Sequence, residues 1–119
     1  THVARYRALY RENFDLAQAI LGPVFGEVRA AGGFFLWLDV GDGEAAAKAL
    51  WAEAAVKVLP GGYMARADAR GINPGAPYIR VALVQDPPQM AAALKRMAPV
   101  LARVVAQHRS AGAARREVV

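Results

Sequence analysis

The sequence predicts an α+β domain, in which helices pack on one small mixed or antiparallel sheet. The predicted order is helix, short strand, strand, helix, strand, long loop, strand, helix. The strands are therefore expected to form one sheet, and the helices to pack on it around one core. The chain has 119 residues, 55% of them hydrophobic and 21% charged, which excludes a disordered chain and allows a packed core. We therefore expect residues 1–119 to form a single domain.

The first part of the chain predicts a helix and a short strand. Apolar residues recur at helical spacing over residues 2 to about 21, and Gly22-Pro23 is expected to end that helix. Residues 25–30 are a candidate strand, and Gly32-Gly33 is a candidate turn. The expected apolar stripe of the helix consists of Val3, Tyr6, Tyr10, Phe14 or Ala17, and Leu21.

Residues 34–40, FFLWLDV, carry the strongest strand signal. Alternation places one set of side chains on each face of this strand, and both sets are largely apolar, so the strand is expected to be central or covered on both sides. One face is expected to carry Phe34, Leu36, Leu38 and Val40, and the other Phe35, Trp37 and Asp39.

Asp42 is a plausible N-cap for a helix that runs to about residue 55. Residues 56–59 are a short strand candidate, and residues 61–77 form a long polar, glycine-rich loop of the kind that is usually functional or disordered. Residues 78–84, YIRVALV, predict a second strong strand. The expected buried stripe of the helix is Ala47, Leu50, Trp51 and Ala54.

Pro87-Pro88 is expected to open a final helix, because proline is tolerated in a first turn. Pro99 falls inside that helix, where it should kink the helix or interrupt its hydrogen bonds, and the tail after Ser110 is expected to fray. The apolar face of this helix is expected to carry Met90, Leu94, Met97, Leu101 and Val104.

Composition excludes several classes of function. Cysteine is absent and the two histidines, His2 and His108, lie near opposite ends, so we expect no disulfide, no cysteine nucleophile and no metal site. No apolar run approaches the roughly 18 residues of a membrane span, no secretory signal opens the chain, and we expect a cytoplasmic protein. The net charge of +5 is scattered rather than gathered in a stripe, so nucleic acid is not an expected partner.

Arg80 is the one charged residue in the strand predicted over residues 78–84. A charge in the middle of a sheet is costly unless an anion pairs with it. The chain itself offers Asp39 or Glu27 for an internal ion pair, and exposure on an open face would also satisfy the charge. A carboxylate ligand is the other explanation, because the planar guanidinium binds both carboxylate oxygens at once.

The loop over residues 61–77 leads directly into this strand. Asn73 lies in the part of the loop that shapes the approach to Arg80. Tyr63 follows Gly61-Gly62, where the absence of side chains lets the backbone approach a ligand. Ordinary packing would also explain Tyr63, but the loop and the arginine together favour a binding site.

Three segments carry a resemblance to a known family. GGFFLWLDV, VKVLPGGYM and NPGAPYIRVALV, in this order and spacing, resemble the C-terminal small domain of class I/II (fold-type I) aminotransferases. Within that family the sequence is similar to those of bacterial succinyldiaminopimelate transaminases of lysine biosynthesis. The resemblance implies that Arg80 pairs with the α-carboxylate of an amino-acid substrate. It also places Gly32 and Gly33 near the substrate, and the loop residues Tyr63 and Asn73 complete the expected substrate-binding set.

The resemblance also implies pyridoxal phosphate as the cofactor of the full-length enzyme. The family's catalytic lysine lies in a large domain far upstream, whereas only 79 residues precede Arg80, and the chain opens midway in a helical pattern. The three lysines, Lys48, Lys57 and Lys95, do not match that lysine's surroundings. We therefore expect a domain that is inactive alone and binds no cofactor alone. Its expected partners are its own large domain, an amino-acid or 2-oxo-acid substrate, and a second subunit of a homodimer.

Two other classes of function stay open from the sequence. The first is a stand-alone, non-catalytic α+β module that binds a small carboxylate or an acidic partner through Arg80. The second, weaker one is a basic nucleic-acid module.

Overall fold

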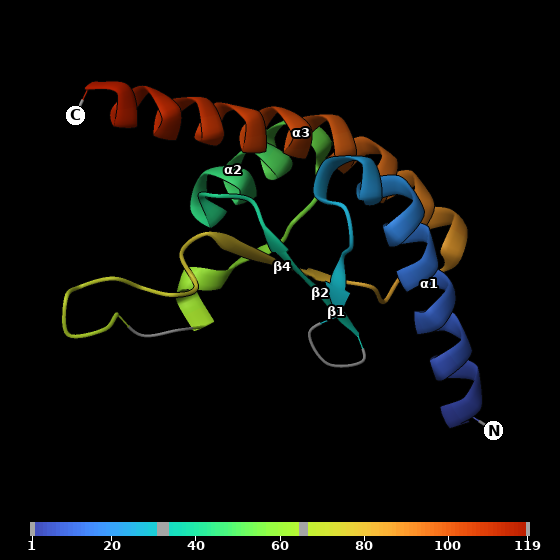
Figure 1. Cartoon of the computed structure of the whole chain (residues 1–119). Coiled ribbons are helices and arrows are strands. Elements are labelled where there is room, and N and C mark those ends of the chain that lie inside the picture. The colour runs from blue at the N-terminus through green and yellow to red at the C-terminus, as the bar shows by residue number, and fades with distance from the viewer. Residues whose placement is uncertain (1, 31–33, 65–66, 119) are drawn as a thin grey trace.

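The computed structural model describes residues 2–30, 34–64 and 67–118 (Figure 1). The prediction of an α+β fold is confirmed, with helices α1, α2 and α3 packed on a four-stranded antiparallel sheet of order β1-β2-β4-β3. The elements are α1 (His2–Phe25), β1 (Arg29–Ala30), β2 (Phe35–Asp39), α2 (Gly43–Ala54), β3 (Leu59–Pro60), the 3-10 helix η1 (Gly61–Met64), β4 (Tyr78–Ala82) and α3 (Pro87–Val118).

The helices gather along one side of the sheet, and the core lies between them and that face (Figure 1). Leu36 pairs with Val81 and Leu38 with Ile79 across β2 and β4, so their side chains share the helix-covered face. All four residues are buried, and the shared face of Leu36 and Leu38 is the one that alternation predicts. The predicted stripe of α3 is also buried, from Met90 to Val104.

The opposite face of the sheet carries none of the helices α1, α2 and α3 in the described part of the chain. Phe35, Trp37, Tyr78 and Arg80 lie on it and are all half-buried. Strand β2 is central, between β1 and β4, which is the first of the two arrangements that its two apolar faces predicted. We call this uncovered side of the sheet the open face.

Helix α1 runs four residues further than expected, through Gly22-Pro23 to Phe25. Pro23 falls in the last turn, and the helix ends instead at Gly26, whose φ of 73° is left-handed and whose N–H donates to the Gly22 carbonyl at 2.7 Å. The predicted strand over 25–30 is correspondingly reduced to β1. The N-terminal part of the predicted stripe is also wrong, because Tyr6 is exposed.

Helix α2 begins as predicted, because the Asp42 carboxylate accepts a hydrogen bond from the Ala45 N–H at 3.1 Å. Its predicted buried stripe is partly wrong: Trp51 is 64% exposed. The predicted Leu50 and Ala54 are buried, and Ala46 completes the buried stripe at a spacing of four residues. Since successive residues are turned by roughly 100°, Trp51 lies well off that stripe.

The remaining differences concern where elements end. The short strand β3 lies at Leu59–Pro60 rather than over residues 56–59, and β4 ends at Ala82 rather than at residue 84. The loop over 61–77 is shorter than expected, because η1 occupies its first four residues. Helix α3 continues through Pro99 and past Ser110 to Val118, so the expected fraying of the tail is wrong. None of the helices in the described ranges is both long enough and apolar enough to cross a membrane.

Candidate functional site

Arg80 projects from the middle of β4 on the open face, directly opposite Trp37 of β2 and Leu59 of β3. Its guanidinium carbon lies 4.2 Å from the centre of the Phe35 ring, within cation–π distance. Among the described residues Arg80 forms no ion pair with Asp39 or Glu27. An Asp39 side-chain oxygen instead accepts the Gly41 N–H at 3.1 Å. The internal ion pair considered from the sequence is therefore not formed, and the guanidinium lies on the open face.

An aromatic stack lies beside Arg80. The rings of Trp37 and Tyr78 stack with centres 5.0 Å apart and planes 17° apart. With Phe35 under the guanidinium, these rings give the open face an apolar floor around one charge. A charge-assisted hydrogen bond to Arg80 would form beside apolar surface, where electrostatic interactions are stronger than in open water.

The loop after β3 packs closely against this stack, and a glycine permits it. A side-chain carbon at Gly61 would lie 2.9 Å from a ring carbon of Trp37 and 2.5 Å from the Gly75 carbonyl oxygen. No real side chain fits those distances, so Gly61 is required where η1 begins. This close approach brings the two ends of the loop together next to β4.

Asn73 holds the loop closed. Its side-chain N–H donates to the Gly62 carbonyl at 2.8 Å, and its side-chain oxygen accepts the Gly75 N–H at 2.9 Å. Both polar groups of the amide thus bind backbone on opposite sides of the loop. The structure gives Asn73 a positioning role beside the Arg80 strand, and direct contact with a substrate stays a prediction.

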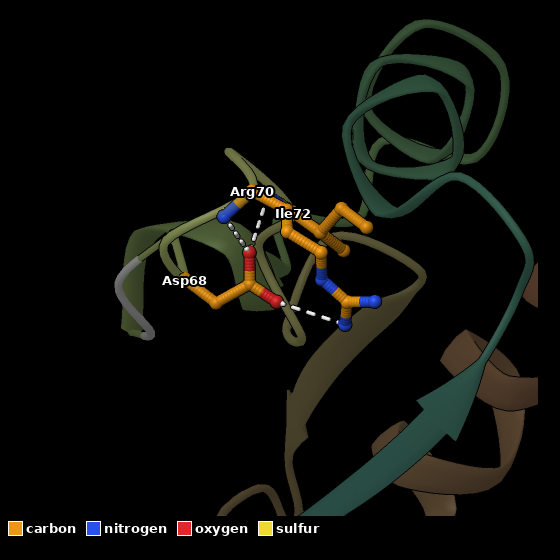
Figure 2. Close-up of polar contacts among 3 residues, drawn as sticks. All are labelled: Asp68, Arg70 and Ile72. Atoms are coloured by element: carbon orange, nitrogen blue, oxygen red, sulfur yellow. Dashed lines mark hydrogen bonds and ion pairs between the residues drawn. The ribbon is translucent and has the colours of Figure 1, made fainter.

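The outer part of the loop is organised by Asp68, as Figure 2 shows. One oxygen of its carboxylate accepts the Ile72 N–H at 3.0 Å and the Arg70 N–H at 2.8 Å, while the other lies 3.4 Å from the Arg70 guanidinium. These hydrogen bonds, chiefly the one from the Ile72 N–H, hold the pKa of Asp68 below its ordinary value. The sequence analysis did not single out Asp68, although an Asp three residues before Gly71 is typical of a side-chain-capped turn.

Tyr63 is 73% exposed and lines a hollow between α2 and β3. Trp51, Lys48 and Lys57 also line that hollow, but Arg80 does not. The structure therefore does not bring Tyr63 and Arg80 into one pocket. The other two predicted substrate-binding residues, Gly32 and Gly33, lie outside the described residues.

The described residues do not fit the site of an aldehyde cofactor held by a lysine. Such a lysine is activated by a sheltered or electrostatically tuned site. Lys48, Lys57 and Lys95 are all exposed, and the Lys48 ammonium forms an ion pair with a Glu44 carboxylate oxygen at 3.5 Å. No group of three or more metal-binding side chains comes together in the part of the chain that the structure describes.

The fold defines a class of domain. A four-stranded antiparallel sheet with three helices on one side, connected in this order, matches the small domain of aminotransferases. The chain is similar to the crystal structure of an aminotransferase from Neisseria meningitidis Z2491, with a TM-score of 0.75 and 40% sequence identity. The match covers 85% of this chain and 26% of the Neisseria chain, in its C-terminal portion. No protein-family model and no curated protein matches the chain.

Proposed function

We propose that this chain is the substrate-carboxylate-binding C-terminal domain of a pyridoxal-phosphate-dependent aminotransferase. The parent enzyme would transfer an amino group between an amino acid and a 2-oxo acid, and the domain alone would be inactive. The observation that carries the proposal is Arg80, whose guanidinium lies on the open face without an ion pair among the described residues. The 40% identity to an aminotransferase supports the choice of reaction.

The chemistry of Arg80 suits this role. A substrate carboxylate presents two oxygens in one plane, and the guanidinium donates to both in the same plane. Two parallel hydrogen bonds fix the direction of the bond from the carboxylate to the α-carbon, and therefore the direction of the α-hydrogen. Phe35 borders the guanidinium and limits the water that competes for it, and Trp37 lies opposite Arg80 in the neighbouring strand.

In the proposed parent enzyme, the cofactor would be held by a domain other than this one. Pyridoxal phosphate supplies an electron sink when it is bound. The lysine that holds it would lie in a large domain outside this sequence, because none of Lys48, Lys57 and Lys95 is suitably placed. The proposal extends to a cytoplasmic homodimer, and to succinyldiaminopimelate transamination in lysine biosynthesis as the particular reaction.

The test is substitution of Arg80 in the full-length protein. Arg80→Lys keeps the charge but loses the paired donors, so kcat/KM should fall by about 30- to 1000-fold, equivalent to roughly 2–4 kcal/mol. Arg80→Ala should be worse. Arg11→Lys, at an exposed position on α1, is the matched control and should leave kcat/KM unchanged.

Stability separates this role from a structural one. Among the described residues the Arg80 side chain contacts the Phe35 ring and forms no ion pair, so Arg80→Ala should cost the chain no more than about 1 kcal/mol in unfolding free energy. Urea denaturation measures that value. A loss of several kcal/mol together with near-normal kcat/KM would contradict the proposal.

A stand-alone module that binds a small carboxylate is the second candidate. The same guanidinium on the open face favours it, since binding a carboxylate there requires no cofactor. The open reading frame discriminates between the two, because only the first candidate requires a lysine-bearing large domain encoded upstream.

A further inference from the structure

We infer that the hollow beside α2, lined by Trp51 and Tyr63, is a binding site for a small aromatic anion, a flat ring that carries a carboxylate or a phosphate. We call it the α2 hollow. Arg80 does not line it, and the inference takes nothing from the role proposed for Arg80. It gives Tyr63 a ligand-binding role at a site separate from the open face.

The α2 hollow has the size and the lining of a small-molecule site. Its volume is about 460 Å³, within the roughly 300–1,000 Å³ that such sites occupy. Ala47 of α2 lines it together with Val58 and Pro60 from the chain around β3, and all three are half-buried. The less exposed part of the lining is therefore apolar, as the ring of a ligand requires.

Two large aromatic side chains border this apolar surface from separate elements. Trp51 on α2 is 64% exposed and Tyr63 on η1 is 73% exposed. Among the described residues, neither ring stacks on the other or on a third ring. Isolated exposed aromatics are ordinary, whereas two that border one hollow form the kind of patch that marks a binding site. Their free faces can stack on a flat ligand ring.

The charges around the α2 hollow favour an anion. Lys48 and Lys57 line it and are exposed, and Glu44 is the acidic residue in the lining. The Glu44 carboxylate lies 3.5 Å from the Lys48 ammonium, so its charge is already compensated. Lys57 forms no ion pair within the ranges that the structure describes. A carboxylate or phosphate beside the rings would supply the missing partner.

The two aromatic side chains are carried by backbone that is already fixed. Trp51 lies within α2, which Asp42 caps. Gly61 permits the close packing at the start of η1, and Tyr63 follows two residues later. Because both elements are formed without a ligand, binding would not have to order the backbone, which reduces its cost.

The test is calorimetric titration of the full-length protein with indole-3-acetate and with indole-3-acetamide. The two probes share one ring and one side-chain skeleton and differ in charge. The protein carries Arg80→Ala, so carboxylate binding at the proposed substrate site does not contribute, and the result is independent of the proposed function. Indole-3-acetate should bind about 3- to 10-fold more tightly than the amide, the effect of exposed ion pairs.

Two further substitutions assign the binding to the α2 hollow. Trp51→Ala should weaken both probes by about 5- to 100-fold, the effect of losing a stacking partner, while Tyr6→Ala, at an exposed aromatic of α1 outside the hollow, should change neither. Lys57→Gln should weaken indole-3-acetate by about 2- to 5-fold and leave the amide unchanged. Lys95→Gln, at an exposed lysine of α3, is its control. All four residues are exposed, so the fold should be retained.

Three results would each overturn the inference. They are failure of indole-3-acetate to bind, equal affinity for the acid and the amide, and undiminished affinity in Trp51→Ala.

Discussion

Gly41 is a residue where one added methyl group would disturb two elements at once. It follows β2 with a left-handed φ of 85°, and a side-chain carbon there would lie 2.3 Å from a ring carbon of His108 on α3. The close contact therefore joins the end of the central strand to the C-terminal half of the last helix. An added carbon would strain the backbone and force the helix or the imidazole to move.

We predict that Gly41→Ala lowers the unfolding free energy by about 2–4 kcal/mol, through backbone strain and overpacking together. Gly26→Ala is the matched control, since its φ is 73° and no atom lies within 4 Å of the added carbon. It should cost only about 1–2 kcal/mol. Urea denaturation compares them, and adding His108→Ala to Gly41→Ala should recover part of the loss. Equal losses of unfolding free energy for the two glycine substitutions would show that the His108 contact does not contribute to the effect of Gly41→Ala.

Asn13 is a buried polar residue that the sequence pattern does not predict. It is fully buried in α1, and its side-chain N–H groups donate to the Leu83 carbonyl at 3.0 Å and the Gln85 carbonyl at 2.7 Å. These bonds join α1 to the segment after β4, about 70 residues away in the chain. An asparagine on a helix looks like a surface residue in the sequence, because its partners exist only after folding.

The loop between η1 and β4 contains a carboxylate, Asp68, whose hydrogen bonds to the backbone depend on its ionisation. Hydrogen bonds from the Ile72 and Arg70 N–H groups lower the pKa of Asp68 in the folded chain, so the carboxylate stabilises the loop. A depressed pKa means that this stabilisation is present above the unfolded-state value and is lost as the pH falls through the folded-state value. The loop should therefore loosen only in acid.

We predict that the amide resonances of Arg70 and Ile72 titrate together at a pH below 3.8, the ordinary value for an aspartate. NMR spectra recorded across the acid range measure this. Asp68→Asn keeps an oxygen acceptor but removes the ionisation, so it should abolish the titration and retain much of the loop. A midpoint at or above 3.8 would contradict the hydrogen-bond network drawn in Figure 2.

At the scale of elements, alternation and helical spacing were sufficient to group residues by face wherever one face of an element is buried. They placed Leu36 and Leu38 together on one face of their strand, and the structure shows that this is the buried face while Arg80 lies on the other side of the sheet. They failed where two positions on one helix were equally apolar, as with Leu50 and Trp51, because only packing decides which of them is buried. They also placed the end of α1 at Gly22-Pro23, since the capping conformation of Gly26 is a property of the folded backbone.

The site was predictable in part for the same reason. A lone charge in an apolar strand identified Arg80, and the register then placed it beside Phe35 and Trp37. Tyr63 lines a different hollow, because η1 turns it toward α2. A run of glycines indicates where the backbone can approach something, but it does not indicate from which side.

Residues 1–119, taken as a whole, should form no specific covalent complex with pyridoxal phosphate. Lys48, Lys57 and Lys95 are all exposed, and none has a sheltered position that would favour one imine. After incubation with pyridoxal phosphate, borohydride reduction and digestion, we predict weak labelling spread over the lysines. Stoichiometric labelling of a single lysine would show that this chain contains a cofactor site of its own.

The most direct test of the central claim pairs a substrate change with a residue change in the full-length protein. An amino-acid substrate is compared with the amine that lacks its carboxylate, in the unsubstituted enzyme and in Arg80→Ala. If Arg80 holds the carboxylate, the unsubstituted enzyme should prefer the amino acid by about 30- to 1000-fold in kcat/KM, and Arg80→Ala should reduce that preference to near one. An undiminished preference in Arg80→Ala would contradict the assignment of Arg80.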